Sequence, residues 1–330
     1  MSGNELTRRD TAAAAVATVE RDPRIYASLA ELVRLQHRAS GFSFLPKQPI
    51  HSLLAGRHGS RLRGRGLDFE ELRQYLPGDD PRTIDWKVTA RTGKPFVRVY
   101  TEERDRPVLL VVDQRVSMFF GSTTKMKSVA AAEAAALSAW RVLDAGDRVG
   151  ALVFSDTEIR ETRPNRSRQT VMRVLHDVVE FNHRLGADGP SGKPEMLNEV
   201  LEHVARVAKH DYLVVLISDF EGAAPPSTRE LVTRIGQHND VLGLFVHDPL
   251  ELELPDSRSL VTSDGELQLE VRASDRRLRS QIGDEMRRRL DVARDLHAKH
   301  GMPTIPITTV GDVAEQVREY IGSTPGAVRG

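Results

Sequence analysis

The chain has 330 residues, a formal net charge of zero at pH 7, 39% hydrophobic residues and 28% charged residues. This length accommodates one large domain and a second module, and the composition is typical of a rather polar globular protein whose overall charge favours neither nucleic acid nor membranes. The sequence contains no cysteine, which excludes disulfides, thiolate metal sites and cysteine nucleophiles.

The N-terminal part of the chain has no regular pattern of strands. We predict a disordered tail over residues 1–22, because its apolar run is short and broken by charges, unlike the core of a signal peptide. The spacing of Ile25, Leu29 and Leu32 predicts a helix over 23–38 that ends before Gly41. This helix and the loop- and β-rich stretch after it form a predicted segment over residues 23–105.

From residue 106 onwards, strands and helices are predicted to alternate. Continuous apolar runs predict buried strands at 107–113, 148–154, 212–218, 241–246 and 304–308, with a short strand from Ile159. Helices are predicted at 125–143, 167–181, 195–208, 228–235 and 275–299, with a hairpin at 259–271. This alternation predicts an α/β domain over 106–322, built on a doubly wound, mostly parallel, Rossmann-like sheet, and a flexible tail at 323–330. All apolar runs are far shorter than the roughly 20 residues of a membrane helix, so we expect a soluble, cytoplasmic protein without membrane insertion.

Two of the predicted strands end in an acidic residue, Asp113 and Asp219. In an open parallel sheet, such ends line the edge where ligands bind. The spacing of Asp113, Arg115 and Ser117 resembles the Asp-x-Ser-x-Ser opening of von Willebrand factor A domains, in which Asp, two Ser, a later Thr and a later Asp coordinate Mg²⁺. Here Arg115 stands at the middle serine, and the threonine position falls near Glu195, where no threonine is close by.

A guanidinium at this edge supplies the positive charge of a metal and offers five donors to carboxylate oxygens. We therefore predict that Arg115 replaces the metal, pairs with Asp113, Asp219 and Glu195, and leaves the protein without a cofactor. Alternatively, Arg115 turns outwards, and Asp113, Ser117 and Asp219 hold a weakly bound Mg²⁺ ion. A third interpretation is that the strand-end carboxylates only cap the helices that follow them.

The segment before the sheet carries a dense set of motifs. They are Gly64-x-Gly66 leading to Asp68-Phe69, Arg73-x-Tyr75, Pro77-Gly78-Asp79-Asp80, Arg82-x-Ile84-Asp85-Trp86, Ala90-Arg91, Val97-Arg98 and Glu103. This set resembles the signature of the bacterial family called domain of unknown function 58, over at least residues 56–156. The resemblance implies a von Willebrand factor A-like domain with a small β-rich N-terminal extension. It also implies an adaptor or substrate-delivery role beside a MoxR-type AAA+ ATPase, and it assigns no catalytic residues.

Arginine and aspartate residues crowd around two aromatic residues in this signature. The pattern favours a structural network that fixes the loops to the sheet, with Trp86 as its apolar anchor. The residues expected in this network are Arg73, Asp79, Asp80, Arg82, Asp85, Trp86 and Arg91. The alternative is a binding site, or a hydrolase site in which Asp79, Asp80 and Asp85 bind Mg²⁺.

We expect a protein-binding function and no enzymatic activity, because the sequence has neither a phosphate-binding loop nor a G-x-S-x-G motif. The expected docking surface is the strand-end face, comprising Asp113, Arg115, Ser117, Phe119, Phe120, Glu195 and Asp219. Simple packing of Phe119 and Phe120 is an equal alternative. Nucleic acid binding through the arginines at 57–65 or 287–289 is less favoured, because acidic residues accompany both clusters and aromatic residues do not interleave them.

Overall fold

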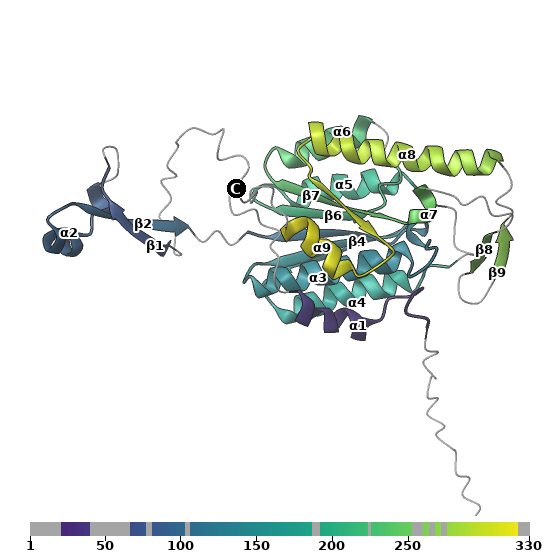
Figure 1. Ribbon diagram of the computed structural model, residues 1–330, viewed down its shortest axis with the longest axis horizontal. Helices are drawn as coiled ribbons and strands as arrows, with labels where there is room; N and C mark the ends of the chain where they lie inside the picture. The colour runs from purple at the N-terminus through teal and green to yellow at the C-terminus, as the bar shows by residue number, and fades with distance from the viewer. Residues whose placement is uncertain are drawn as a thin grey trace, which may run out of the picture.

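A six-stranded sheet forms the centre of the protein (Figure 1). The computed structural model describes residues 21–39, 67–76, 81–102, 106–186, 192–223, 226–252, 260–263, 268–271 and 276–322. Across the sheet the strands are β10 (Thr304–Thr308), β7 (Asp240–His247), β6 (Leu213–Ser218), β3 (Val108–Asp113), β4 (Val149–Phe154) and β5 (Ile159–Asn165). Neighbouring strands are parallel except for β5, which pairs antiparallel with β4. The predicted mostly parallel α/β sheet is confirmed.

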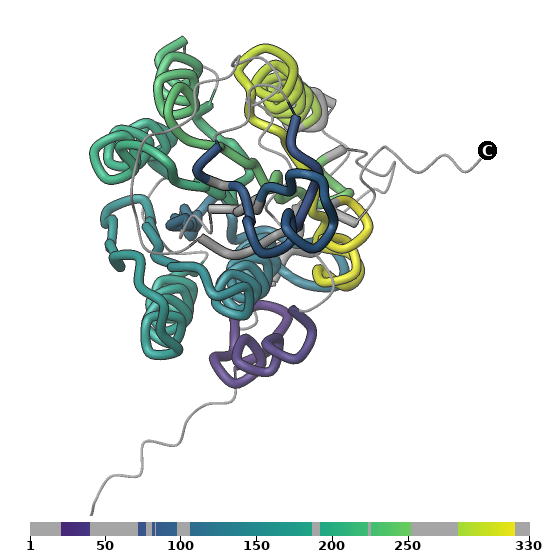
Figure 2. Tube along the Cα trace, turned by 90° about the vertical axis from the view of Figure 1, so that its left-hand side faces the viewer, coloured from purple at the N-terminus to yellow at the C-terminus, as the bar shows by residue number. Residues whose placement is uncertain are grey.

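Helices cover both faces of the sheet (Figures 1 and 2). One face carries α1 (Leu29–Arg34), α3 (Lys127–Asp144), α4 (Arg168–Asn182) and α9 (Val313–Gly322), and the other carries α5 (Met196–Val207), α6 (Pro226–Gly236) and α8 (Arg276–Lys299). Alternate strand residues enter the two apolar cores, Leu110 on the first face and Leu109 on the second. Because both faces are covered, the central strands are apolar throughout. None of these helices, as far as the structure describes them, has both the length and the apolar character needed to cross a bilayer.

The winding of the sheet reverses between β3 and β6. The chain runs from β3 to β4 and β5, and then returns to β6 on the opposite side of β3. Asp113 is the last residue of β3, and Asp219 directly follows β6. Both carboxylates therefore lie at the switch point, where an open α/β sheet binds its ligands.

Residues 21–39, here called the N-terminal strap, lie against the helices of the first face (Figure 1). The predicted helix over 23–38 is shorter in the structure, because α1 starts at Leu29 and continues as the 3-10 helix η1 (Leu35–Arg38). The preceding residues form a turn in which the Asp22 carbonyl accepts hydrogen bonds from the amides of Ile25 and Tyr26. Leu32 is buried in the core, and its carbonyl accepts a hydrogen bond from Trp140 Nε1 at 3.0 Å.

Two antiparallel strands, β1 (Leu67–Gln74) and β2 (Phe96–Glu102), form a hairpin that carries the 3-10 helix η2 (Pro81–Thr83) and the helix α2 (Trp86–Thr92). The strand β2 was predicted and α2 was not. Figure 1 draws the hairpin to the left of the main domain and clear of it. Its exit is fixed at Arg106, whose guanidinium contacts Asp240 Oδ2 at 2.6 Å and the Tyr212 carbonyl at 3.1 Å. Asp240 begins β7 and Tyr212 precedes β6, so the hairpin joins the domain at the amino ends of the strands.

The expected role of Trp86 as an apolar anchor is wrong, because 69% of this residue is exposed. Asp85, in contrast, is buried and caps α2 by accepting hydrogen bonds from the amides of Lys87 and Val88. The segment packs on its own hairpin, since the Asp85 amide donates to the Phe96 carbonyl at 2.8 Å and Val97 is 2% exposed. Asp79 and Asp80 lie outside the described residues.

The last part of the chain largely follows the prediction. The short helix α7 (Pro249–Leu252) follows β7, and the predicted hairpin is present as β8 (Leu260–Ser263) and β9 (Gln268–Val271). The helix α9 was not predicted. The predicted tails at 1–22 and 323–330 fall almost entirely outside the described residues, and the division of the chain at residue 106 stays a prediction.

Candidate functional site

Arg115 is folded back onto the strand from which it emerges. Its Nε lies 3.0 Å from Asp113 Oδ1, and one terminal nitrogen, Nη2, lies 2.7 Å from Asp113 Oδ2. Both side chains are fully buried. Ser218 at the end of β6 donates a further side-chain hydrogen bond to Asp113 Oδ2, at 2.6 Å. The predicted pairing of Arg115 with Asp113 is therefore present, and the alternative in which Arg115 turns outwards is wrong.

Backbone carbonyls from two loops complete the surroundings of Arg115. Its Nη1 donates to the Pro194 carbonyl at 3.3 Å, and its Nη2 donates to the Glu221 carbonyl at 3.1 Å. Gly222 allows these loops to meet, because it has a φ of +82° and a Cβ there would lie 2.1 Å from the Pro194 oxygen. Burial disfavours the charged guanidinium, but Asp113 and Asp219 outweigh burial and raise the pKa of Arg115.

Asp219 is the second buried carboxylate of the switch point. Its Oδ2 accepts hydrogen bonds from Lys127 Nζ at 2.9 Å and from Arg289 Nη1 at 2.8 Å. Arg115 Nη2 forms a longer ion pair with Asp219 Oδ1, at 3.8 Å, and this oxygen accepts a hydrogen bond from Ser117 Oγ at 3.4 Å. Burial alone would raise the pKa of Asp219, but the charges of Lys127, Arg289 and Arg115 hold this pKa well below its usual value.

An outer layer of carboxylates completes the cluster. Glu251 Oε1 accepts from Lys127 Nζ at 2.6 Å, and Glu221 Oε1 accepts from Arg289 Nη2 at 3.0 Å. We call the whole set the buried charge network: Asp113, Arg115, Lys127, Asp219, Glu221, Glu251 and Arg289. It combines three cations with four carboxylates, so the charges nearly cancel within the protein.

The loop after β3 is held on both sides of this network. Asp156 accepts hydrogen bonds from the amides of Val116 and Lys193, both at 2.7 Å, and so joins this loop to the one that precedes α5. Gln114 accepts from Asn182 Nδ2 at 3.1 Å, and Asn182 Oδ1 in turn accepts from the Ala27 amide of the strap at 2.7 Å. These bonds fix the loop geometry around Arg115.

Phe119 and Phe120 are half-buried in the same loop. The ring of Phe119 lies 5.9 Å from that of Tyr26 in the strap, and Lys127 Nζ lies 5.8 Å from the centre of the Phe120 ring. Both rings therefore have packing contacts, which is the simpler of the two interpretations that the sequence allowed.

The predicted pairing of Arg115 with Glu195 is wrong. Glu195 is exposed, and among the described contacts of Arg115 its place is taken by the carbonyl of the neighbouring residue, Pro194. Four members of the buried charge network were not predicted: Lys127, Glu221, Glu251 and Arg289. The sequence did hold a signal for Arg289: Met286, Ala293 and Leu296 are buried on α8 at helical spacing, and Arg289 falls on the same stripe.

The residues of the fallback metal site do not fit a divalent cation in this arrangement. Mg²⁺ needs carboxylate and hydroxyl oxygens that are free to coordinate it. Both oxygens of Asp113 accept hydrogen bonds from Arg115, and Oδ2 of Asp219 accepts from two cationic side chains. A metal ion would have to displace buried positive charges that already neutralise these carboxylates.

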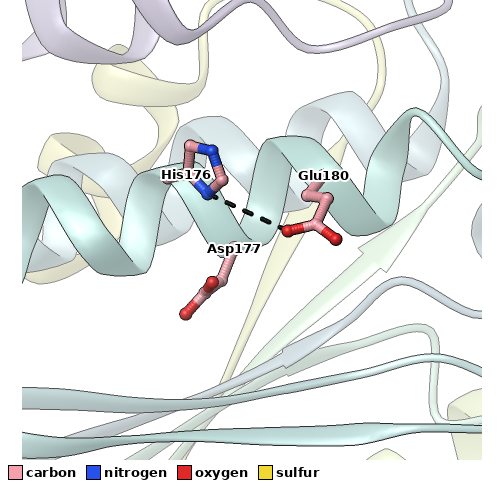
Figure 3. A group of neighbouring side chains, drawn as sticks. All are labelled: His176, Asp177 and Glu180. Atoms are coloured by element: carbon pink, nitrogen blue, oxygen red, sulfur yellow. Dashed lines mark ion pairs between the residues drawn. The ribbon is translucent and has the colours of Figure 1, made fainter.

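A second group of potential metal ligands lies on α4 and comprises His176, Asp177 and Glu180 (Figure 3). His176 Nδ1 lies 3.9 Å from Glu180 Oε2. Both carboxylates are already paired with Arg160, whose Nη1 lies 3.1 Å from Asp177 Oδ1 and 2.6 Å from Glu180 Oε2. This group is therefore an ion-pair cluster that joins α4 to β5.

Comparison with known proteins identifies the family. The family model described as "Protein of unknown function DUF58" matches residues 71–291. Three uncharacterized proteins, Rv1480 and MT1527 of Mycobacterium tuberculosis (strains H37Rv and CDC 1551) and Mb1516 of Mycobacterium bovis, are each 30% identical over 290 residues, which cover 86% of this chain and 88% of theirs.

Two solved structures are similar to this chain at low TM-scores. One is an aerotolerance-related membrane protein from Bacteroides fragilis, at a TM-score of 0.38, 15% identity and coverage of 66% of this chain and 96% of the other. The other is the conserved hypothetical protein BatB from Bacteroides thetaiotaomicron, at a TM-score of 0.35, 14% identity and coverage of 66% and 100%. The match of the family model and the mycobacterial relatives together place the chain in the DUF58 family.

Proposed function

We propose that this chain is a non-enzymatic adaptor of the cytoplasm that binds a protein partner, a MoxR-type AAA+ ATPase, through its strand-end face. The observation that carries the proposal is the buried charge network. Arg115, Lys127 and Arg289 neutralise the carboxylates that a catalytic or metal-binding site would have to offer to a ligand. A face without open coordination positions, fixed by Asp156 and by the strap, suits docking better than turnover. The class of partner comes from the family resemblance.

Two other functions have less support. For nucleic acid binding, Arg289 faces inwards to Asp219, while Arg287 and Arg288 are exposed and pair with Asp284 and Glu285 one turn away. For a Mg²⁺-dependent hydrolase, Asp85 is occupied as the cap of α2. The remaining carboxylates of that candidate site, Asp79 and Asp80, lie outside the described residues.

The test uses the purified full chain and the MoxR-type ATPase of the same organism. We expect direct binding in biolayer interferometry, weakened about tenfold in Phe120→Ala because an aromatic contact is lost from the face. Tyr320→Ala, which alters an exposed aromatic residue on α9, serves as the matched control and keeps wild-type affinity. Absence of binding by the wild-type chain would contradict the proposal.

Calorimetric titration of the chain alone with Mg²⁺ and with Mn²⁺ tests whether Arg115 closes the site around Asp113 and Asp219 to metal ions. We expect no saturable heat of binding from either ion. Clear binding would contradict the prediction that Arg115 replaces the metal. Turnover of a phosphoester or peptide substrate that is abolished in Asp85→Asn would show that the chain is an enzyme after all.

A further inference from the structure

One face of α2, here called the outer face, is exposed and carries both basic residues and a tryptophan. At about 100° per residue, Trp86, Ala90, Lys87 and Arg91 follow one another around an arc of about 140°. All four are exposed, whereas Val88 and Thr89 on the remaining side are half-buried against the hairpin, where Thr89 Oγ1 accepts a hydrogen bond from the Phe96 amide at 3.1 Å. Lys94, just beyond the end of the helix, is exposed as well.

The cations on this face have no partner among the described residues. The side chains of Lys87, Arg91 and Lys94 make no ion pair or hydrogen bond with the residues that the structure describes, in contrast to Asp85 and Arg82 close by. Lys87 and Arg91 are one turn apart, so their like charges repel each other. A carboxylate placed between them would relieve this repulsion.

Trp86 on this face is exposed to solvent as well. Three of the five large hydrophobic residues that are exposed among the described residues belong to this hairpin segment: Trp86 at 69%, Leu76 at 59% and Leu72 at 38%. The other tryptophan of the chain, Trp140, is 4% exposed. An exposed tryptophan beside an arginine has the composition of an interface hot spot.

We propose that the outer face of α2 is a second docking surface, which binds an acidic segment of a protein through Lys87, Arg91 and Lys94 while an apolar side chain of that segment packs on Trp86. The bound segment is protein and not nucleic acid, because the three cations of this face, Lys87, Arg91 and Lys94, are too few for the many phosphate contacts from which nucleic acid binding draws its affinity. They are enough to pair with a few carboxylates that flank an apolar side chain. An adaptor needs two surfaces, and this one is separate from the strand-end face.

The test measures binding of the full chain to two labelled peptides of equal length, one built from glutamate and leucine and its twin built from lysine and leucine. We expect the acidic peptide to bind, to shift the emission of Trp86 to the blue and to shield it from acrylamide, while the buried Trp140 stays unchanged. The double variant Lys87→Glu/Arg91→Glu should lose about tenfold in affinity for the acidic peptide and gain affinity for the basic twin. Trp86→Ala should weaken binding of the acidic peptide and remove the emission change.

The matched control is Arg287→Glu/Arg288→Glu, which reverses two exposed charges on α8 and should keep wild-type affinity. Equal binding of the acidic peptide by the Lys87→Glu/Arg91→Glu variant would overturn the proposal. So would tighter binding of an oligothymidine strand than of the acidic peptide. Binding of the ATPase is measured in parallel. If the ATPase binds the wild type and Phe120→Ala equally, only the proposal that it docks on the strand-end face is contradicted. The proposal for the α2 surface is decided by the peptide measurements.

Discussion

The buried charge network and the outer face of α2 use the same kinds of side chain in opposite ways. In the network, Arg115 and Lys127 have exposed fractions of at most 1%, and each is paired with carboxylates of this chain. On α2, Lys87 and Arg91 are exposed and have no partner within the described part of the chain. The comparison teaches that arginine and lysine stabilise the fold where the protein supplies the counter-charge, and are available for recognition where it does not.

The largest effect is expected from Asp219→Ala. This change removes the shared acceptor of Lys127, which is buried, and of Arg289, whose side chain is 12% exposed, so the free energy of unfolding should fall by about 3–5 kcal/mol. Urea denaturation of both proteins at pH 7 measures the difference. Asp284→Ala, in an exposed ion pair on α8, is the control and should leave stability close to wild type. Equal losses in the two variants would show that the network does not stabilise the fold.

The same carboxylate predicts a response to acid. The cations around Asp219 hold its folded-state pKa below the value of about 3.9 in the unfolded chain. Its contribution is therefore fully present above that unfolded value and is lost as the pH falls through the folded one. The stability gap between the wild type and Asp219→Asn should stay constant down to about pH 5 and narrow below about pH 4. A gap that widens in acid would contradict the direction of this pKa shift.

A smaller effect is expected from Gly222→Ala, which adds a Cβ where the two loops around Arg115 meet. The positive φ of +82° alone costs about 1–2 kcal/mol for a residue with a side chain, and the contact with the Pro194 oxygen adds to it. Gly146→Ala is a matched control, because its φ is +83° and nothing lies within 4 Å of the added atom. In thermal denaturation, Gly222→Ala should lower the melting temperature more than Gly146→Ala does. Equal decreases would mean that the loops carrying Pro194 and Glu221 move apart at little cost.

The smallest effect on stability is expected from Lys87→Glu/Arg91→Glu on α2. The reversal keeps a like-charge pair one turn apart and breaks no ion pair within the described residues, so the free energy of unfolding should change by less than about 0.5 kcal/mol. Urea denaturation checks this value alongside the binding assay. A large loss would mean that these cations have a structural role, as expected from the sequence for Arg91.

The architecture could be predicted from the sequence because the central strands are buried on both faces and are therefore apolar throughout, as in Val108–Val112. Arg115 could be predicted because it interrupts a motif at a fixed distance from Asp113. Lys127 could not, since α3 is buried almost all round and offers no polar face against which a buried lysine would stand out. Trp86 was misplaced because tryptophan usually packs into a core, and neighbours in the sequence do not reveal whether a core lies beside it.

The anchoring of Arg106 at the amino ends of β6 and β7 has a consequence for how two proteins could be held at once. Four Cα steps of about 3.8 Å separate Arg106 from Glu102, so the end of β2 stays within about 15 Å of that edge. The charge network lies at the opposite edge, across a strand of six residues, or about 20 Å. A molecule seated on the hairpin and another seated over Arg115 would therefore approach from opposite ends of the sheet. On this geometry, the two proposed surfaces can be occupied at the same time without one bound molecule displacing the other.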